Sequence, residues 1–80
     1  MTLTEAIKSG IIQLCEDNNL TINALAENSA LAPSTIKNIL YGKSKNPRIV
    51  LIKMICDSLN MTLTEFFNTD NFNHLEPEIK

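Results

Sequence analysis

The side chains best suited to chemistry in this chain are cationic and lie near its middle. Residues 28–56 contain five cations and no acid, and the cations are Lys37, Lys43, Lys45, Arg48 and Lys53. Acids outnumber cations on both sides of this segment, so the 80-residue chain has a net charge of −2 around a basic centre. A basic segment between acidic ends is typical of a protein with one face that meets phosphates, although five ordinary surface cations would give the same pattern.

A predicted helix over residues 33–41 places three polar side chains, Ser34, Lys37 and Asn38, on its outward face. An Asn amide can bond bidentately to adenine, and a Lys ammonium can donate to the acceptors of guanine. These side chains are therefore candidates for reading the edges of base pairs. A solvated polar helix face is the simpler alternative.

Groups that could support catalysis or hold a metal are sparse. His74 is the single histidine, and no paired carboxylates or nucleophile with a base stand near it. Cys15 and Cys56 form no CxxC motif and have no histidine beside them, and each falls in an apolar helical stripe. We therefore expect no enzyme activity, no metal site and no cofactor, and we expect both thiols to stay reduced in the core.

Length and composition indicate one small globular domain. Apolar residues make up 44% of the chain and charged residues 20%, which is ordinary for a soluble fold. No apolar run approaches the roughly 20 residues that span a bilayer, and the first residues lack the layout of a signal peptide, so we expect a cytoplasmic protein with no membrane contact. We divide the chain into a domain over residues 1–67 and an acidic C-terminal tail over residues 68–80, which should fray after its first few residues.

Capping patterns place the starts of three helices. Thr2 with Glu5, and Thr62 with Glu65, have the spacing of a capping box and open the first and fifth predicted helices. Thr21 is a favourable N-cap for the second. Apolar residues at helical spacing follow each of these caps, as amphipathic helices require.

The third and fourth predicted helices are marked mainly by their ends. Pro33 suits the first position of the third helix, although Ala32 before it offers no side-chain acceptor. Gly42 and Asn60 suit the left-handed residue that follows the third and fourth helices. With no strand pattern anywhere, the sequence predicts an all-α fold of five short helices with mixed crossing angles.

The second and third predicted helices fit a helix-turn-helix, which needs a supporting helix, a tight turn and a second helix with an exposed face. The motif reads Leu20-Thr21-x-x-x-Leu25-Ala26 and then Ser34-Thr35-Ile36-x-x-Ile39-x-x-Gly42. Together with its continuation to Phe67, it resembles the lambda-repressor and Cro-like (XRE) family. The resemblance implies a five-helix lambda-repressor-like DNA-binding domain and a sequence-specific transcriptional regulator, expected to be a repressor, that reads the major groove with the third helix.

The resemblance also implies roles for individual residues. Pro33 joins Ser34, Lys37 and Asn38 at positions that face the groove, where its ring offers only apolar contact. Arg48 resembles a position that reaches toward the minor groove. Contacts to the DNA backbone are expected from Thr21, Asn23, Tyr41, Lys43, Ser44, Lys45 and Asn46. For the loop residues among them the alternative is solvation alone, and Tyr41 could instead cover the end of its helix.

Three positions depart from the family pattern. The usual turn glycine is Ala30, which must either adopt a left-handed conformation or relax the turn. The usual Gln at the start of the second helix is Ile22. A charged pair common in relatives is replaced by Cys15 and Leu40, which we expect to pack together in the core.

The expected partner is double-stranded DNA, with no small-molecule substrate. Because one domain reads only a half-site, we expect a homodimer on DNA, formed by the fifth helix and the tail around Phe66, Phe67 and Phe72, with Phe67 as the surface anchor. The alternative is a protein-interaction module, such as an antitoxin or a regulator that binds another protein. Salt-sensitive DNA binding distinguishes the two classes.

Overall fold

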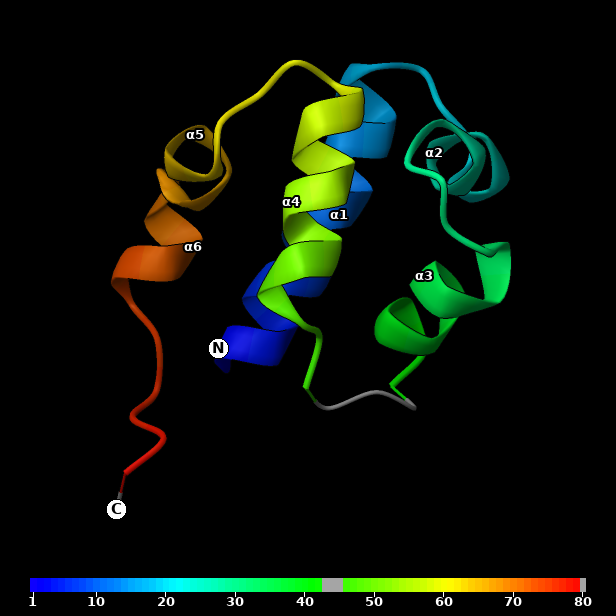
Figure 1. Ribbon diagram of the computed structural model, residues 1–80. Coiled ribbons are helices and arrows are strands. Elements are labelled where there is room, and N and C mark those ends of the chain that lie inside the picture. Colours follow the sequence, from blue (N-terminus) through cyan, green and yellow to red (C-terminus); the bar gives the residue numbers. More distant parts are fainter. Residues whose placement is uncertain (43–45, 80) are drawn as a thin grey trace.

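The computed structural model describes residues 1–42 and 46–79, and these ranges are helical with short connections and no strand (Figure 1). The predicted helices are present close to their expected bounds. The structure adds a short sixth helix in the tail. The helices are α1 (Leu3–Asp17), α2 (Ile22–Asn28), α3 (Pro33–Leu40), α4 (Ile49–Ser58), α5 (Leu63–Phe67) and α6 (Asp70–Asn73).

Three threonine caps start helices as predicted. The hydroxyl oxygens of Thr2, Thr21 and Thr62 accept hydrogen bonds from amides three residues later, at 3.2, 3.1 and 3.0 Å. The amide of Thr2 in turn donates to the Glu5 carboxylate at 2.9 Å, and this hydrogen bond, together with the one from the Thr2 side chain, lowers the pKa of that carboxyl. Each cap satisfies an amide that the helix itself leaves without a partner.

Each of the four longest helices is followed, two residues after its last residue, by a residue in the left-handed conformation. Asn19, Ala30, Gly42 and Asn60 have φ values of 53°, 58°, 82° and 53°. After α1, α2 and α4, the next amide donates back to a helix carbonyl five residues earlier, at 2.9 to 3.0 Å. This arrangement reverses the chain while it satisfies a free carbonyl. The alternative for Ala30 is thus resolved, because this alanine adopts the strained conformation and the turn stays tight.

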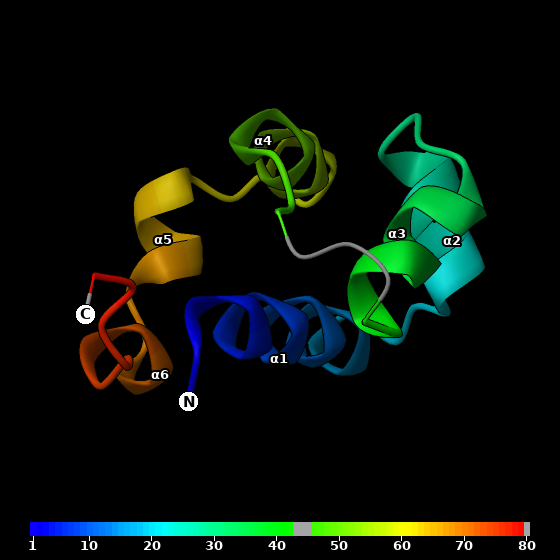
Figure 2. The ribbon, with the colours of Figure 1, turned by 90° about the horizontal axis from the view of Figure 1, so that it is seen from below.

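The core lies between α1 and α4, which occupy opposite sides of the molecule when it is seen from below (Figure 2). The pair α2–α3 closes one end of this layer, and the pair α5–α6 closes the other. Ala26 is fully buried where α2 packs against its neighbours, and Gly10 lets the ring of Phe66 approach α1, since a Cβ at residue 10 would lie 3.0 Å from the ring. The buried apolar residues are Ala6, Ile7, Ile11, Leu14, Cys15, Leu25, Ala26, Ile36, Ile39, Ile52, Ile55, Cys56 and Phe66.

Both cysteines are buried and free, as the sequence predicted. Burial raises the pKa of the Cys15 thiol and of the Cys56 thiol, with smaller contributions from the neighbouring acids Glu16 and Asp57. Leu40, the expected neighbour of Cys15, is half-buried against the same core.

The tail is more ordered than the sequence predicted. Phe67 and Phe72 meet edge to face with ring centroids 4.9 Å apart, and both rings pack against Phe66. Beyond α6 the amide of Glu76 donates to the carbonyl of Met1 at 3.0 Å. Phe67 is therefore half-buried within its own chain and half-exposed, so it is not wholly free on the surface.

Replacing Ala30 by Gly should raise the free energy of unfolding by about 1 kcal/mol. The left-handed conformation at φ 58° places an alanine Cβ close to the following carbonyl oxygen, and glycine has no Cβ. Urea unfolding would measure the change. The same substitution at Ala24, inside α2, should instead lower stability by about 0.5–1 kcal/mol. A loss of stability at both positions would contradict this account of the turn.

Candidate nucleic-acid interface

Helix α3 separates its residues into a buried face and an exposed face. Ile36 and Ile39 are buried in the core, and these two contacts fix how the helix rotates about its axis. Because residues three and four apart share a helix face, the opposite side is available to solvent. The structure places every predicted base-reading residue of this helix in exposed positions, namely Pro33, Ser34, Lys37 and Asn38.

The start of α3 has no side-chain cap. Ala32 is the N-cap residue and makes no side-chain capping hydrogen bond, and Pro33 follows with no amide hydrogen to satisfy. At the other end Tyr41 is the C-cap and is 68% exposed, so its ring does not cover the core. The helix thus offers polar side chains along its length and an exposed phenol at its end.

The start of α2 contributes two further exposed polar side chains. Thr21 already accepts a hydrogen bond from the amide of Ala24, which leaves its hydroxyl proton free to donate to an acceptor outside the protein. Asn23 is exposed in the first turn. Both lie at the positive end of a helix, where anionic groups are favoured.

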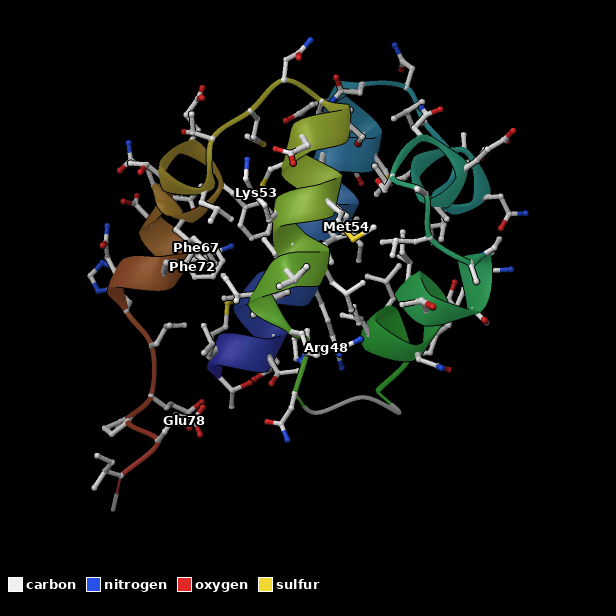
Figure 3. The ribbon with its side chains drawn as sticks, viewed as in Figure 1. Arg48, Lys53, Met54, Phe67, Phe72 and Glu78 are labelled. Carbon is white, nitrogen blue, oxygen red and sulfur yellow. The ribbon has the colours of Figure 1, made fainter. Side chains whose placement is uncertain are left out.

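The segment between α3 and α4 carries the remaining predicted contacts. Lys43, Ser44 and Lys45 lie outside the described residues. Asn46 and Arg48 are exposed, and Arg48 is the N-cap residue of α4 without a side-chain capping hydrogen bond. Figure 3 shows Arg48 at the foot of α4, on the side of that helix nearer to α3.

Two lysines lie elsewhere than the basic segment over residues 28–56 would suggest. Lys53 forms an ion pair with Asp57 one turn later on α4, and Figure 3 shows its side chain toward α5 rather than toward α3. Lys8 of α1, which falls in an acidic stretch of sequence, instead approaches the end of α3, since a Cβ at Gly42 would lie 3.7 Å from its Nζ. Spacing of four residues in a helix could have identified the first pair, whereas nothing local identifies the second.

The acidic tail also reaches this end of the molecule. Glu78 shares with Lys8, Gly42, Asn46 and Pro47 the lining of an open hollow beside the start of α1. Figure 3 shows Glu78 low on the molecule, at the same end as Arg48. The hollow beside the start of α1 is therefore lined by charges of both signs. With Lys53 paired to Asp57 as well, fewer cations are available for DNA than the charge of residues 28–56 indicates.

Other kinds of site find no support in the described ranges. Over residues 1–42 and 46–79, no three His, Cys, Asp or Glu side chains gather closely enough to hold a metal ion. None of the helices in this part is long and apolar enough to cross a membrane.

Helices α2 and α3, joined by a left-handed turn and held by a shared apolar core, form a helix-turn-helix unit. Residues 11–71 match the Cro/C1-type HTH DNA-binding domain. The chain belongs to this family of DNA-binding domains, and its all-helical structure is a lambda-repressor-like fold.

A solved structure supports the same conclusion. The chain is similar to the prophage Lp1 protein 11, known from a crystal structure, with 31% sequence identity and a TM-score of 0.81. The alignment covers 94% of this chain and 99% of that chain. No curated protein sequence matches the chain.

Proposed function

We propose that this protein is a sequence-specific transcriptional regulator, acting as a repressor, that reads the DNA major groove with α3. The observation that carries the proposal is the division of α3, in which four candidate reading residues are exposed while Ile36 and Ile39 anchor the helix. An α-helix fits the major groove, where each base pair presents a distinct pattern of donors and acceptors. A repressor then acts by occupying a site that transcription requires.

Selection of bound duplexes from a random library, followed by titration at several salt concentrations, tests this proposal. We expect one preferred sequence, and an affinity that falls steeply with salt because phosphate contacts release counterions. His74→Ala, in the exposed segment after α6, should leave binding unchanged. If the protein bound no duplex at low salt, the protein-interaction module would become the better interpretation.

The contribution of Arg48 can be tested against a charge-matched control. Arg48→Ala should weaken duplex binding and reduce the salt slope by roughly one, because a contact of this cation with the DNA backbone or minor groove is lost. Lys53→Ala removes the same charge, but this lysine is paired with Asp57 and directed toward α5. Equal effects of the two substitutions would show that only net charge matters and that Arg48 makes no local contact.

We also propose that two copies bind DNA as a homodimer, to which the tail over residues 68–80 contributes. Two half-sites one helical turn apart, about 34 Å, require a two-fold pair of reading helices. The candidate surface is the α5–α6 end, where Phe67 and Phe72 remain half-exposed beside each other. Sedimentation of the protein with the selected duplex should give two protomers per duplex. Phe67→Ala should make the second protomer bind more weakly, and saturation at one protomer would contradict the dimer.

A further inference from the structure

A pair of serine hydroxyls joins the turn after α2 to the end of α4. Ser29, the C-cap residue of α2, is 4% exposed, and its Oγ donates to Oγ of Ser58 at 3.2 Å. Ser58 in turn donates to the carbonyl oxygen of Ile55 at 2.7 Å. Between described residues, no other hydrogen bond between two side chains connects different helices.

The rest of the α2–α4 contact is apolar. The two helices pack directly against each other, and Leu25, Ala26, Ile52 and Cys56 belong to one buried cluster. Apolar contacts hold the two helices together through close packing of their side chains, but they have no bond direction. The serine hydrogen bond is partly buried, and a hydrogen bond shielded from water is directional and costly to leave unmade. The serine pair therefore adds a directional contact to the apolar packing that places α2 along α4.

The serine pair lies directly before the turn that leads into α3, so it also bears on where α3 is placed. Ala30, in its left-handed conformation, follows Ser29 directly, and Leu31 then donates back to the carbonyl of Ala26 at 2.9 Å. Two residues further on, α3 begins. The helix-turn-helix is thus fixed to one end of α4, while Arg48 stands at the other end of the same helix. Figure 1 shows α4 running between these two regions.

We infer that the Ser29–Ser58 hydrogen bond is a positioning contact that sets how well the protein discriminates its preferred DNA sequence from random DNA. This inference rests on the proposed function. Base contacts from α3 and the contact of Arg48 with the DNA backbone or minor groove must be made on one duplex at once, so the placement of α3 relative to α4 matters. Hydrogen bonds to base edges tolerate little displacement, whereas long cationic side chains follow a displaced phosphate. Loss of the pair should therefore reduce specific binding and leave non-specific binding intact.

The test measures the ratio of affinities for the selected duplex and for a random duplex in three variants. Ser29→Ala should lower the ratio about three- to tenfold with little change on random DNA, by analogy with the loss of part of a base contact. Ser58→Ala should lower it similarly, because Ser29 then lacks its acceptor. The double variant should lose no more than the worse single variant, since both substitutions remove one interaction.

Thermal unfolding separates positioning from simple loss of stability. Ile7→Val removes a buried methylene from α1, away from the serine pair, and should lower the melting temperature while it leaves the affinity ratio unchanged. An unchanged ratio in Ser29→Ala, or a parallel loss on both duplexes, would overturn the inference.

Asn38→Ala tells failure of the inference apart from failure of the proposed function. If this variant lowers the ratio while Ser29→Ala does not, only the role of the serine pair is wrong. If the unmodified protein shows no preferred duplex, the proposed function fails and the inference fails with it.

Discussion

Asn38→Ala is expected to weaken binding to the preferred duplex by about 1–3 kcal/mol, roughly 5- to 150-fold. Asn38 is exposed on the face of α3 opposite the buried Ile36 and Ile39, so its amide can reach a base edge without rearrangement of the helix. Removing the amide leaves an adenine donor and acceptor unpaired in the groove. Competition titration with duplexes altered one base pair at a time would show relaxed discrimination at one position.

A second Asn→Ala substitution, away from α3, controls for the loss of an exposed amide as such. Asn71→Ala removes the same amide from an exposed position on α6, which lies at the opposite end of the molecule from α3 (Figure 1). It should leave the discrimination between base pairs unchanged. If Asn38→Ala weakened preferred and random duplexes equally, Asn38 would be a backbone contact and the direct reading of bases by this residue would be wrong.

Local rules were sufficient for most of the fold. The caps at Thr2, Thr21 and Thr62 and the left-handed ends at Gly42 and Asn60 depend on side chains and backbone within a few residues, and all are present. Such features are readable from sequence because their energies are set by neighbours along the chain.

Features that depend on tertiary packing were not predicted. Helix α6 has an N-cap, Thr69, that makes no side-chain hydrogen bond, and the helix is stabilised by the packing of Phe72 on Phe66 and Phe67. Because these ring contacts and the packing of α6 against α1 form only in the folded chain, periodicity within residues 68–80 does not reveal the helix.

In the candidate site, too, some features follow from local sequence and others depend on tertiary contacts. Helical periodicity was enough to place Ser34, Lys37 and Asn38 outside, because Ile36 and Ile39 define the inner face. It could not relate Lys8 to Gly42, or Ser29 to Ser58, since these pairs are far apart in sequence and meet only in the folded chain. The exposure of the candidate reading residues was thus predictable, while the long-range contacts beside their helix were not.

Ile36→Ala should lower the free energy of unfolding by about 2–5 kcal/mol, the largest stability effect we expect from one substitution in α3. Ile36 is fully buried (0% exposed) in the cluster that α3 shares with α2 and α4, so the truncated side chain leaves a cavity that its neighbours cannot fill completely. Small domains have only about 5–15 kcal/mol of total stability, so a large share of it would be lost.

The loss of stability in Ile36→Ala should also weaken DNA binding, because fewer molecules are folded. The Ile36 side chain itself is buried and does not face the DNA. Adding the preferred duplex should raise the melting temperature of the variant, because a ligand that binds only the folded state shifts the unfolding equilibrium. Ile12→Ala, at a 45% exposed position on α1, provides the matched control and should cost well under half as much. Equal destabilisation by the two substitutions in urea unfolding would mean that Ile36 does not anchor α3, and the division of that helix into a buried and a reading face would have to be abandoned.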